Sequence, residues 1–309
     1  MVQTVLLAAM VFYWRHYLGQ NWQQLRTSGF TFEWQPTLLA GLVILAGYIL
    51  LGVLWAPLCR EIGCISLSPA QAFRVSSIAG MGRYLPGKVW SVAGKIYLTA
   101  PDRSQAPAAG IAAGLESVWF QGSGLLLALM VLPFTNLGDL VPVRARGLSA
   151  GILLLCVLAV HPRIFCPVAN LFLRLIRRPP LPGRPRYSML LLLMAGYMAV
   201  FAFWSTGFAL FAGSVMPVGL EETTAFWAIT PMAWAAGFFS LFAPAGLGVR
   251  DSVLALGLGQ VFPARPAAIL VVVAGTRALT TLAEFACFAL ALAQGSPRRP
   301  APAPAGPAG

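Results

Sequence analysis

Long apolar runs are the feature that most constrains what this chain can fold into. A bilayer's hydrocarbon core is about 30 Å thick, and a helix needs about 20 mostly apolar residues to cross it. Runs that reach or approach this length lie at residues 2–18, 37–58, 110–133, 147–160, 187–212 and 264–293. Because a lipid-exposed backbone must satisfy its own hydrogen bonds, such runs cross as helices. The sequence therefore predicts an all-α polytopic integral membrane protein.

The composition supports this class and excludes two others. The chain is 58% hydrophobic and 10% charged, whereas a soluble domain carries about 25% charged residues. The 21 Lys and Arg against 9 Asp and Glu give a formal charge of +12. Positive-inside topology and affinity for anionic lipid explain such an excess. No soluble stretch is long enough to build a basic nucleic-acid-binding face, so we expect no nucleic-acid partner.

Two further apolar regions, residues 70–98 and 222–261, are interrupted by helix-breaking residues. Proline lacks a backbone donor and glycine frees the backbone, so together they break a helix. At membrane depth, broken backbone is tolerated only where protein buries it or where it lines a wet cavity. The residues that break these regions are Pro86, Gly87, Pro244, Gly246 and Gly248.

The distribution of arginines predicts a topology. Residues 163–186 hold six arginines and no acid, and the tail carries Arg298 and Arg299, so both should be cytoplasmic. The arginine-rich segment and the tail both lie on the cytoplasmic side if each interrupted region enters the membrane and returns to the side from which it came. We therefore expect six crossing helices and two re-entrant hairpins of opposite orientation, with both chain ends cytoplasmic. Eight full crossings are the alternative.

The chain reads as one transmembrane domain over residues 1–294, followed by a disordered Pro/Ala/Gly-rich tail over residues 295–309. The run at residues 2–18 is short and lacks a small-residue cleavage site. We expect it to be a helix that begins outside this sequence.

Three cations cluster at the first break without an acid near them: Arg83, Lys88 and Lys95. A charge at membrane depth is costly and requires an anion or water. We interpret the cluster as a site for an anionic headgroup, most simply a lipid phosphate. The alternative is interfacial snorkelling beside belt aromatics, namely Tyr84, Trp90 and Tyr97.

Arg250 follows the second break and also has two interpretations. It could contact phosphate, or it could form a structural ion pair with Asp251, which would cap the next helix.

Two acids, Glu116 and Glu284, lie inside apolar helices, and Arg277 precedes Glu284 by seven residues on the same helix face. An intramembrane acid is by default a proton relay or a counter-ion. The alternative is a buried ion pair that holds helices together. The sequence does not say which acid meets which cation.

Nothing in the sequence predicts catalysis, a metal or a cofactor. The chain has no GxSxG, HExxH or phosphate-cradling GxxxxGK[ST] motif. Its five cysteines form no CxxC pair and it has only two histidines, so we expect neither a zinc nor a haem site.

One sequence block resembles a known family. Arg-Tyr-Leu-Pro-Gly-Lys-Val-Trp-Ser-Val-Ala-Gly-Lys at residues 83–95 is similar to the hallmark of the lysylphosphatidylglycerol synthase transmembrane-domain family. These are flippase-like membrane domains related to the N-terminal half of multiple peptide resistance factor. Glu116, His161-Pro162-Arg163 and the run Pro-Ala-Gly-Leu-Gly-Val-Arg-Asp at residues 244–251 agree with the resemblance, which covers residues 15–294.

The resemblance implies a bacterial-type cytoplasmic (inner) membrane protein that binds or moves an anionic lipid or a lipid-linked glycan. The sequence carries no soluble aminoacyl-transferase domain after its last helix, so we do not expect synthase activity. The leading hypothesis is a flippase-like transporter of an anionic lipid or lipid-linked phosphate. The alternatives are a membrane enzyme acting on a lipid-linked phosphate and a non-transporting accessory subunit.

Overall fold

In the computed structural model of this chain, all the regular secondary structure of the described part is helical. No strand occurs among those residues. They are residues 33–63, 65–84, 89–100, 103–135, 137, 151, 155, 158, 160–175, 177–181, 183–240 and 248–294.

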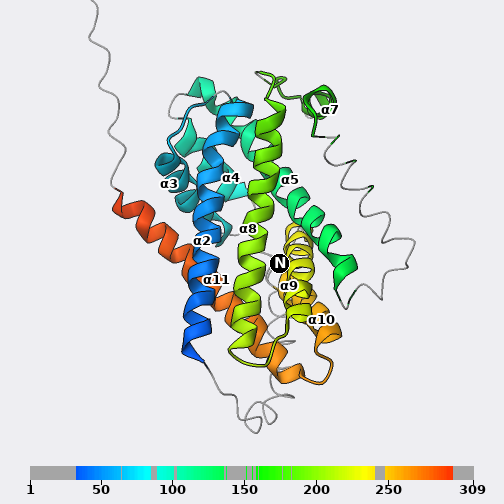
Figure 1. Cartoon of the computed structure of the whole chain (residues 1–309). Helices are drawn as coiled ribbons and strands as arrows, with labels where there is room; N and C mark the ends of the chain where they lie inside the picture. Colours follow the sequence, from blue (N-terminus) through cyan, green and yellow to red (C-terminus); the bar gives the residue numbers. More distant parts are fainter. Residues whose placement is uncertain are drawn as a thin grey trace, which may run out of the picture.

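Four long helices form the frame of the molecule (Figure 1). They are α2 (Trp34–Leu58), α5 (Ala106–Val131), α8 (Tyr187–Gly213) and α11 (Pro266–Ala293). With the turns that extend α2 and α5, all are long and apolar enough to cross a membrane. They match four predicted crossings and confirm an all-helical chain with candidate membrane spans. The predicted crossing at residues 2–18 lies outside the described residues, as does most of the one at residues 147–160.

The two interrupted regions fold into pairs of shorter helices. The first region contains α3 (Pro69–Gly80), a short 3₁₀ turn η2 (Met81–Tyr84) and α4 (Val89–Thr99), and α3 packs against α4. The second contains α9 (Leu220–Phe239) and α10 (Val249–Val261), which also pack together. The two pairs lie toward opposite ends of the long helices (Figure 1). The predicted breaks at Pro86, Gly87, Pro244 and Gly246, and Lys88 beside them, lie outside the described residues.

Local sequence explains where two of these short helices begin. The Ser68 hydroxyl accepts a hydrogen bond from the Gln71 amide (3.2 Å), and the Gln71 side chain accepts one from the Ser68 amide (2.9 Å), which forms a capping box before Pro69. Gly248 precedes α10 with φ of 84°, a conformation that favours glycine. The Asp251 carboxylate accepts a hydrogen bond from the Gly248 amide (3.4 Å), so Asp251 caps the helix as expected.

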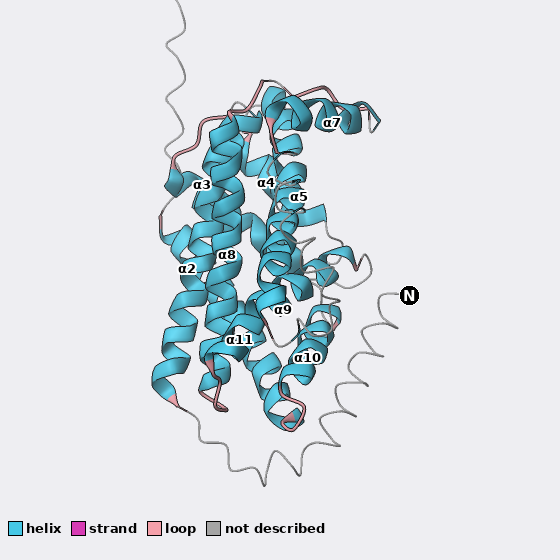
Figure 2. Ribbon diagram, turned by 45° about the vertical axis from the view of Figure 1, so that its right-hand side comes forward, coloured by secondary structure: helices cyan, strands magenta, loops and turns pink. Residues whose placement is uncertain are grey.

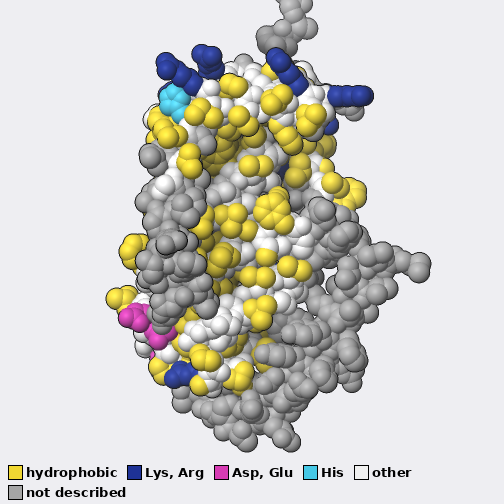
Figure 3. All heavy atoms as spheres, turned by 90° about the vertical axis from the view of Figure 1, so that its right-hand side faces the viewer, with side chains coloured by type: hydrophobic (Ala, Val, Ile, Leu, Met, Phe, Trp, Pro, Cys, Tyr) yellow, Lys and Arg dark blue, Asp and Glu magenta, His cyan; other side chains and the backbone are white. Residues whose placement is uncertain are grey.

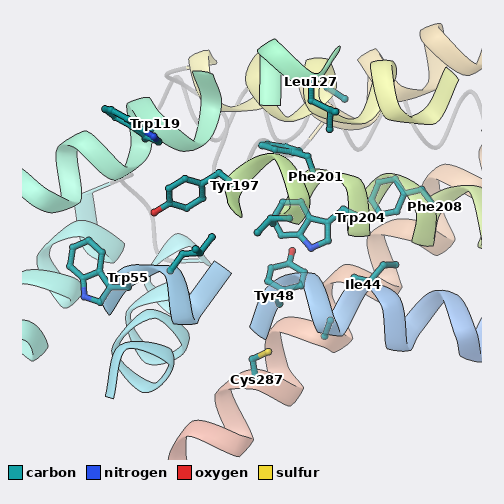
Figure 4. Close-up of a cluster of buried hydrophobic side chains, with 14 of the residues drawn as sticks. Ile44, Tyr48, Trp55, Trp119, Leu127, Tyr197, Phe201, Trp204, Phe208 and Cys287 are labelled. Atoms are coloured by element: carbon teal, nitrogen blue, oxygen red, sulfur yellow. The ribbon is translucent and has the colours of Figure 1, made fainter. Parts of the chain in front are cut away.

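The core is a row of large aromatic side chains on one face of α8. Tyr197, Phe201, Trp204 and Phe208 are fully buried and face α2 and its neighbours (Figure 4). The Trp204 ring lies 4.7 Å from Tyr48 of α2, between ring centroids. Aromatic pairs at this separation add to the stability that their burial supplies. This row fixes α2 against α8, and the polar groups described below adjoin it.

A charge pair joins α2 to α8 at one end of the bundle. Glu61, in the π-helical turn Cys59–Gly63 after α2, accepts hydrogen bonds from the Arg186 amide (3.0 Å) and from Arg186 Nη2 (2.8 Å). These hydrogen bonds and the attraction of the carboxylate raise the pKa of Arg186 above its ordinary value. The pair sets where α8 starts relative to the end of α2.

Gly207 lets α8 approach α2 closely, and we predict that Gly207→Ala destabilises the fold. An added Cβ would lie 2.5 Å from Ile44 Cγ1 and 3.1 Å from the Ala40 carbonyl oxygen, which belongs to rigid backbone. Such overpacking costs about 1–3 kcal/mol. Thermal unfolding of the detergent-purified protein measures the loss. Gly213→Ala in the same helix is the matched control, because a Cβ there meets nothing within 4 Å. Equal midpoints for the two variants would contradict the prediction.

Candidate functional site

A cavity of about 280 Å³ lies among the helices at the middle of their lengths. Each of the four long helices lines it with residues from its central part, for example Leu51 of α2, Phe120 of α5, Trp204 of α8 and Thr280 of α11. Both pairs of short helices also contribute lining residues. A polar cavity at this position would lie near the centre of a bilayer that the four helices cross.

The cavity lining contains more positive than negative side chains. Four cations and two acids line it: Arg83, Lys95, Arg250, Arg277, Glu116 and Glu284. The lining therefore has two more formal positive charges than negative ones. Asp251 contacts Arg250 without lining the cavity and reduces this excess to one.

Glu284 of α11 joins three segments of the chain. Its Oε1 accepts hydrogen bonds from Arg83 Nη1 (2.7 Å) and from the Tyr48 hydroxyl (2.7 Å), and its Oε2 accepts one from the Tyr84 hydroxyl. The Glu284 side chain is 9% exposed. A buried carboxylate is stable as a charge only where a cation and donors of this kind surround it. Glu284 thus fastens η2, beside the first break, to α2 and α11.

Lys95 of α4 makes the second ion pair. Its ammonium group donates to Glu116 Oε2 and lies 4.4 Å from the centre of the Trp55 ring. The other oxygen of Glu116 is buried and has no hydrogen-bond partner among the residues that the structure describes. The Lys95 side chain is 14% exposed and points inward. Lys95 thus pairs inside the helix bundle, whereas Trp90 on the same helix is exposed.

Arg250 forms an ion pair and also lines the cavity. Its Nε lies 3.4 Å from Asp251 Oδ1, and its guanidinium lies 4.1 Å from the centre of the Trp234 ring of α9. Asp251 also caps α10, so the pair is structural. Arg250 nevertheless lines the cavity, which leaves it in reach of a ligand.

Arg277 is the cation whose charge is least compensated. It lines the cavity and is partly buried. Within the described ranges its guanidinium pairs with no carboxylate, and it lines the same cavity as Arg250. Glu284, which shares its helix face, pairs with Arg83 instead. An anionic group in the cavity would compensate the charge of Arg277.

The structure thus brings six predicted residues into one cavity, although their chain positions run from 83 to 284. Lys88 lies outside the described residues. Sequence reasoning missed Tyr48, Gln121 and Trp234. Tyr48 and Gln121 could have been found as lone polar groups within predicted crossings, whereas nothing distinguishes Trp234 from other aromatic residues of its helix.

The rest of the lining mixes apolar and aromatic residues with hydroxyl and amide side chains. Its aromatic rings form an apolar wall, in which the Trp204 ring lies 5.8 Å from Phe120 and 4.6 Å from Trp234, between ring centroids. An apolar wall beside a cationic patch suits a ligand with an anionic group and an apolar part. Among the described residues, no group of three or more His, Cys, Asp or Glu side chains could hold a metal ion. The described cysteines Cys59, Cys166 and Cys287 are free and buried.

Comparisons of the chain with models of protein families, with curated proteins and with solved structures find no match.

The Lys95–Glu116 pair yields a stability prediction. Lys95→Ala leaves the buried Glu116 carboxylate unpaired, and breaking one side of a buried pair costs about 3–5 kcal/mol. Adding Glu116→Ala should restore part of that loss, because the double variant leaves no unpaired charge. Thermal unfolding in detergent of the two single variants and the double variant gives the coupling free energy. If the losses of stability in the two single variants simply add in the double variant, the two side chains do not interact and the prediction is wrong.

Proposed function

We propose that this protein is a flippase-like transporter that binds an anionic lipid or a lipid-linked phosphate in the central cavity and moves it across the cytoplasmic membrane. One observation carries the proposal. Cations from both interrupted regions, Arg83, Lys95 and Arg250, converge with Arg277 on a cavity at the middle of the long helices. A transporter that holds its substrate between the two leaflets requires a polar site at this depth.

The charges of the cavity favour an anionic ligand. A cation at membrane depth costs about 2.5–3.5 kcal/mol on insertion scales. Glu284 and Glu116 compensate Arg83 and Lys95, but no carboxylate in the described part of the chain compensates Arg277. Guanidinium groups bind phosphate through paired charge-assisted hydrogen bonds. A phosphate that reaches Arg250 and Arg277 would supply the missing negative charge, and the aromatic wall would hold the apolar part of the ligand.

The proposed architecture has six crossings and two re-entrant hairpins. The α3/α4 pair would enter from the cytoplasmic side and the α9/α10 pair from the opposite side. Residues near both breaks, Tyr84 and Val92 in the first region and Phe238 and Arg250 in the second, line the same cavity. Broken helices of opposite orientation that meet at a central site are typical of transporters with inverted repeats. Rocking of one pair against the other would open the cavity to each leaflet in turn.

We also propose that the chain belongs with the flippase-like domains that its sequence resembles. The motif residues Arg83, Lys95, Glu116 and Arg250 are far apart in the chain and yet lie around one cavity, as a shared substrate site requires. Movement would be downhill or coupled to an ion through Glu116 or Glu284, since an arriving phosphate competes with these carboxylates for Lys95 and Arg83.

Arg277→Gln should weaken the binding of anionic lipid by about tenfold or more, because it removes charge-assisted hydrogen bonds worth about 1.5–3 kcal/mol. Native mass spectrometry of the purified protein measures the amount of bound phosphatidylglycerol. Arg265→Gln is the control, because Arg265 is exposed and lies outside the cavity lining. Equal lipid retention by the two variants would contradict the proposed site.

Transport is tested separately, in proteoliposomes that contain fluorescent phosphatidylglycerol in both leaflets. Dithionite destroys the fluorophores it reaches, so transbilayer movement appears as loss of the protected half of the signal. We expect Arg277→Gln to slow this loss and Arg265→Gln to leave it unchanged. Equal rates for the native protein, Arg277→Gln and protein-free vesicles would favour an accessory role, and a change in the mass of the lipid would favour the enzyme alternative.

A further inference from the structure

Helix α7 (Pro162–Leu175) lies outside the cavity and is not explained by transport. It lies across one end of the long helices and extends sideways from the bundle (Figure 2). A helix in this position would lie along the membrane surface if α8 crosses the membrane.

One face of α7 packs against the bundle. Cys166, Ala169 and Leu173 are buried, and Phe165 meets the Trp119 ring of α5 with 4.9 Å between ring centroids. The Asn170 side chain accepts a hydrogen bond from the Leu181 amide (2.8 Å), which holds the following segment against the helix. These contacts identify the face of α7 that is turned toward the rest of the molecule.

The opposite face is an exposed apolar stripe. Its five side chains recur at the spacing of a single helix face and are 47–80% exposed: Ile164, Val168, Leu171, Phe172 and Leu175. None of these five side chains packs into the hydrophobic core of the part of the chain that the structure describes. An apolar face of this size requires a lipid or protein surface to cover it.

Arginines border the stripe on one side and follow the helix. Arg163 and Arg174 lie along one edge of α7, and Arg177, Arg178 and Arg184 come after it. All five are exposed, and none pairs with a carboxylate among the described residues. Lys and Arg side chains gather at this end of the molecule, whereas acidic side chains appear at the other end (Figure 3).

Two of these arginines, Arg177 and Arg178, lie in the turn that ends α7. Arg177 has φ of 56°, a left-handed conformation that glycine usually occupies at a helix end. The Arg178 amide donates to the Leu173 carbonyl (2.7 Å) and the Arg177 amide to the Arg174 carbonyl (3.0 Å), which closes the helix. Two cations therefore lie at the end of the apolar stripe, at a position where glycine would be the less strained choice.

From this combination we infer that α7 is an interfacial amphipathic helix that binds the anionic surface of the leaflet beside it. The apolar stripe enters the boundary between headgroups and acyl chains, and the arginines contact lipid phosphates. The charge pattern selects this occupant over a protein partner, because five uncompensated arginines match an anionic lipid surface continuous with the one around the bundle. Each arginine near such a surface favours binding by about fivefold. This inference does not depend on the cavity or on transport.

Hydrogen–deuterium exchange of the full-length protein in nanodiscs tests the surface. We expect the amides of residues 164–175 to exchange at least tenfold more slowly in nanodiscs that contain phosphatidylglycerol than in pure phosphatidylcholine. Substitution of Arg163, Arg174 and Arg178 by Gln should remove most of this difference. Peptides from α8 serve as the internal control and should exchange equally in both lipids. Exchange of α7 that is independent of lipid charge would overturn the inference.

A second measurement tests the direction of the stripe and remains informative if the triple variant folds poorly. Val168→Cys lies in the apolar stripe and Arg174→Cys on the basic edge, and peptide-level mass spectrometry reads each thiol separately from the buried Cys166. In phosphatidylglycerol nanodiscs, a water-soluble maleimide should label Arg174→Cys at least tenfold faster. Equal labelling would overturn the inference, as would a Val168→Cys disulfide between two copies, which would identify the stripe as a protein interface.

Discussion

The compensation of charge at membrane depth is the constraint on which the rest of this structure depends. Arg83 and Lys95 each lie against a carboxylate from another helix, Glu284 and Glu116 respectively. In a medium where water does not screen charge, an unpaired ion is costly enough to displace the segment that carries it. These two pairs therefore hold the first interrupted region against α5 and α11 and determine where the cavity lies.

The same constraint gives the cavity its chemical character. Glu284 accepts hydrogen bonds from one arginine and two tyrosines, and its charge is neutralised by Arg83. Arg277, on the same helix, has no acidic partner among the described residues. The ion-paired groups of the lining are thus neutral together, and Arg277 adds a positive charge that no described acid compensates. The fold uses its acids to hold helices together and leaves positive charge for a ligand, and this is the physical basis of the proposed lipid-phosphate site.

Much of the fold could be predicted from the sequence, because hydropathy and helix breakers act locally. The runs at residues 37–58, 110–133, 187–212 and 264–293 became α2, α5, α8 and α11 with small changes at their ends. The interrupted regions became pairs of short helices for the same reason. Pairing partners were beyond prediction: the spacing of Arg277 and Glu284 brings them to one helix face, yet the structure gives Glu284 to Arg83, from a segment 201 residues away.

The sequence by itself indicated that the chain belongs in a membrane, where its helices lie, and which residues supply most of the charges in the cavity. These follow from the free energy of placing each side chain in lipid, which depends on the residue and its close neighbours. The tertiary structure alone decided which charges neutralise one another, that Trp234 joins the site, and that the exposed stripe of α7 and its arginines lie together at one end of the bundle. These outcomes depend on distances between helices, which no local pattern specifies.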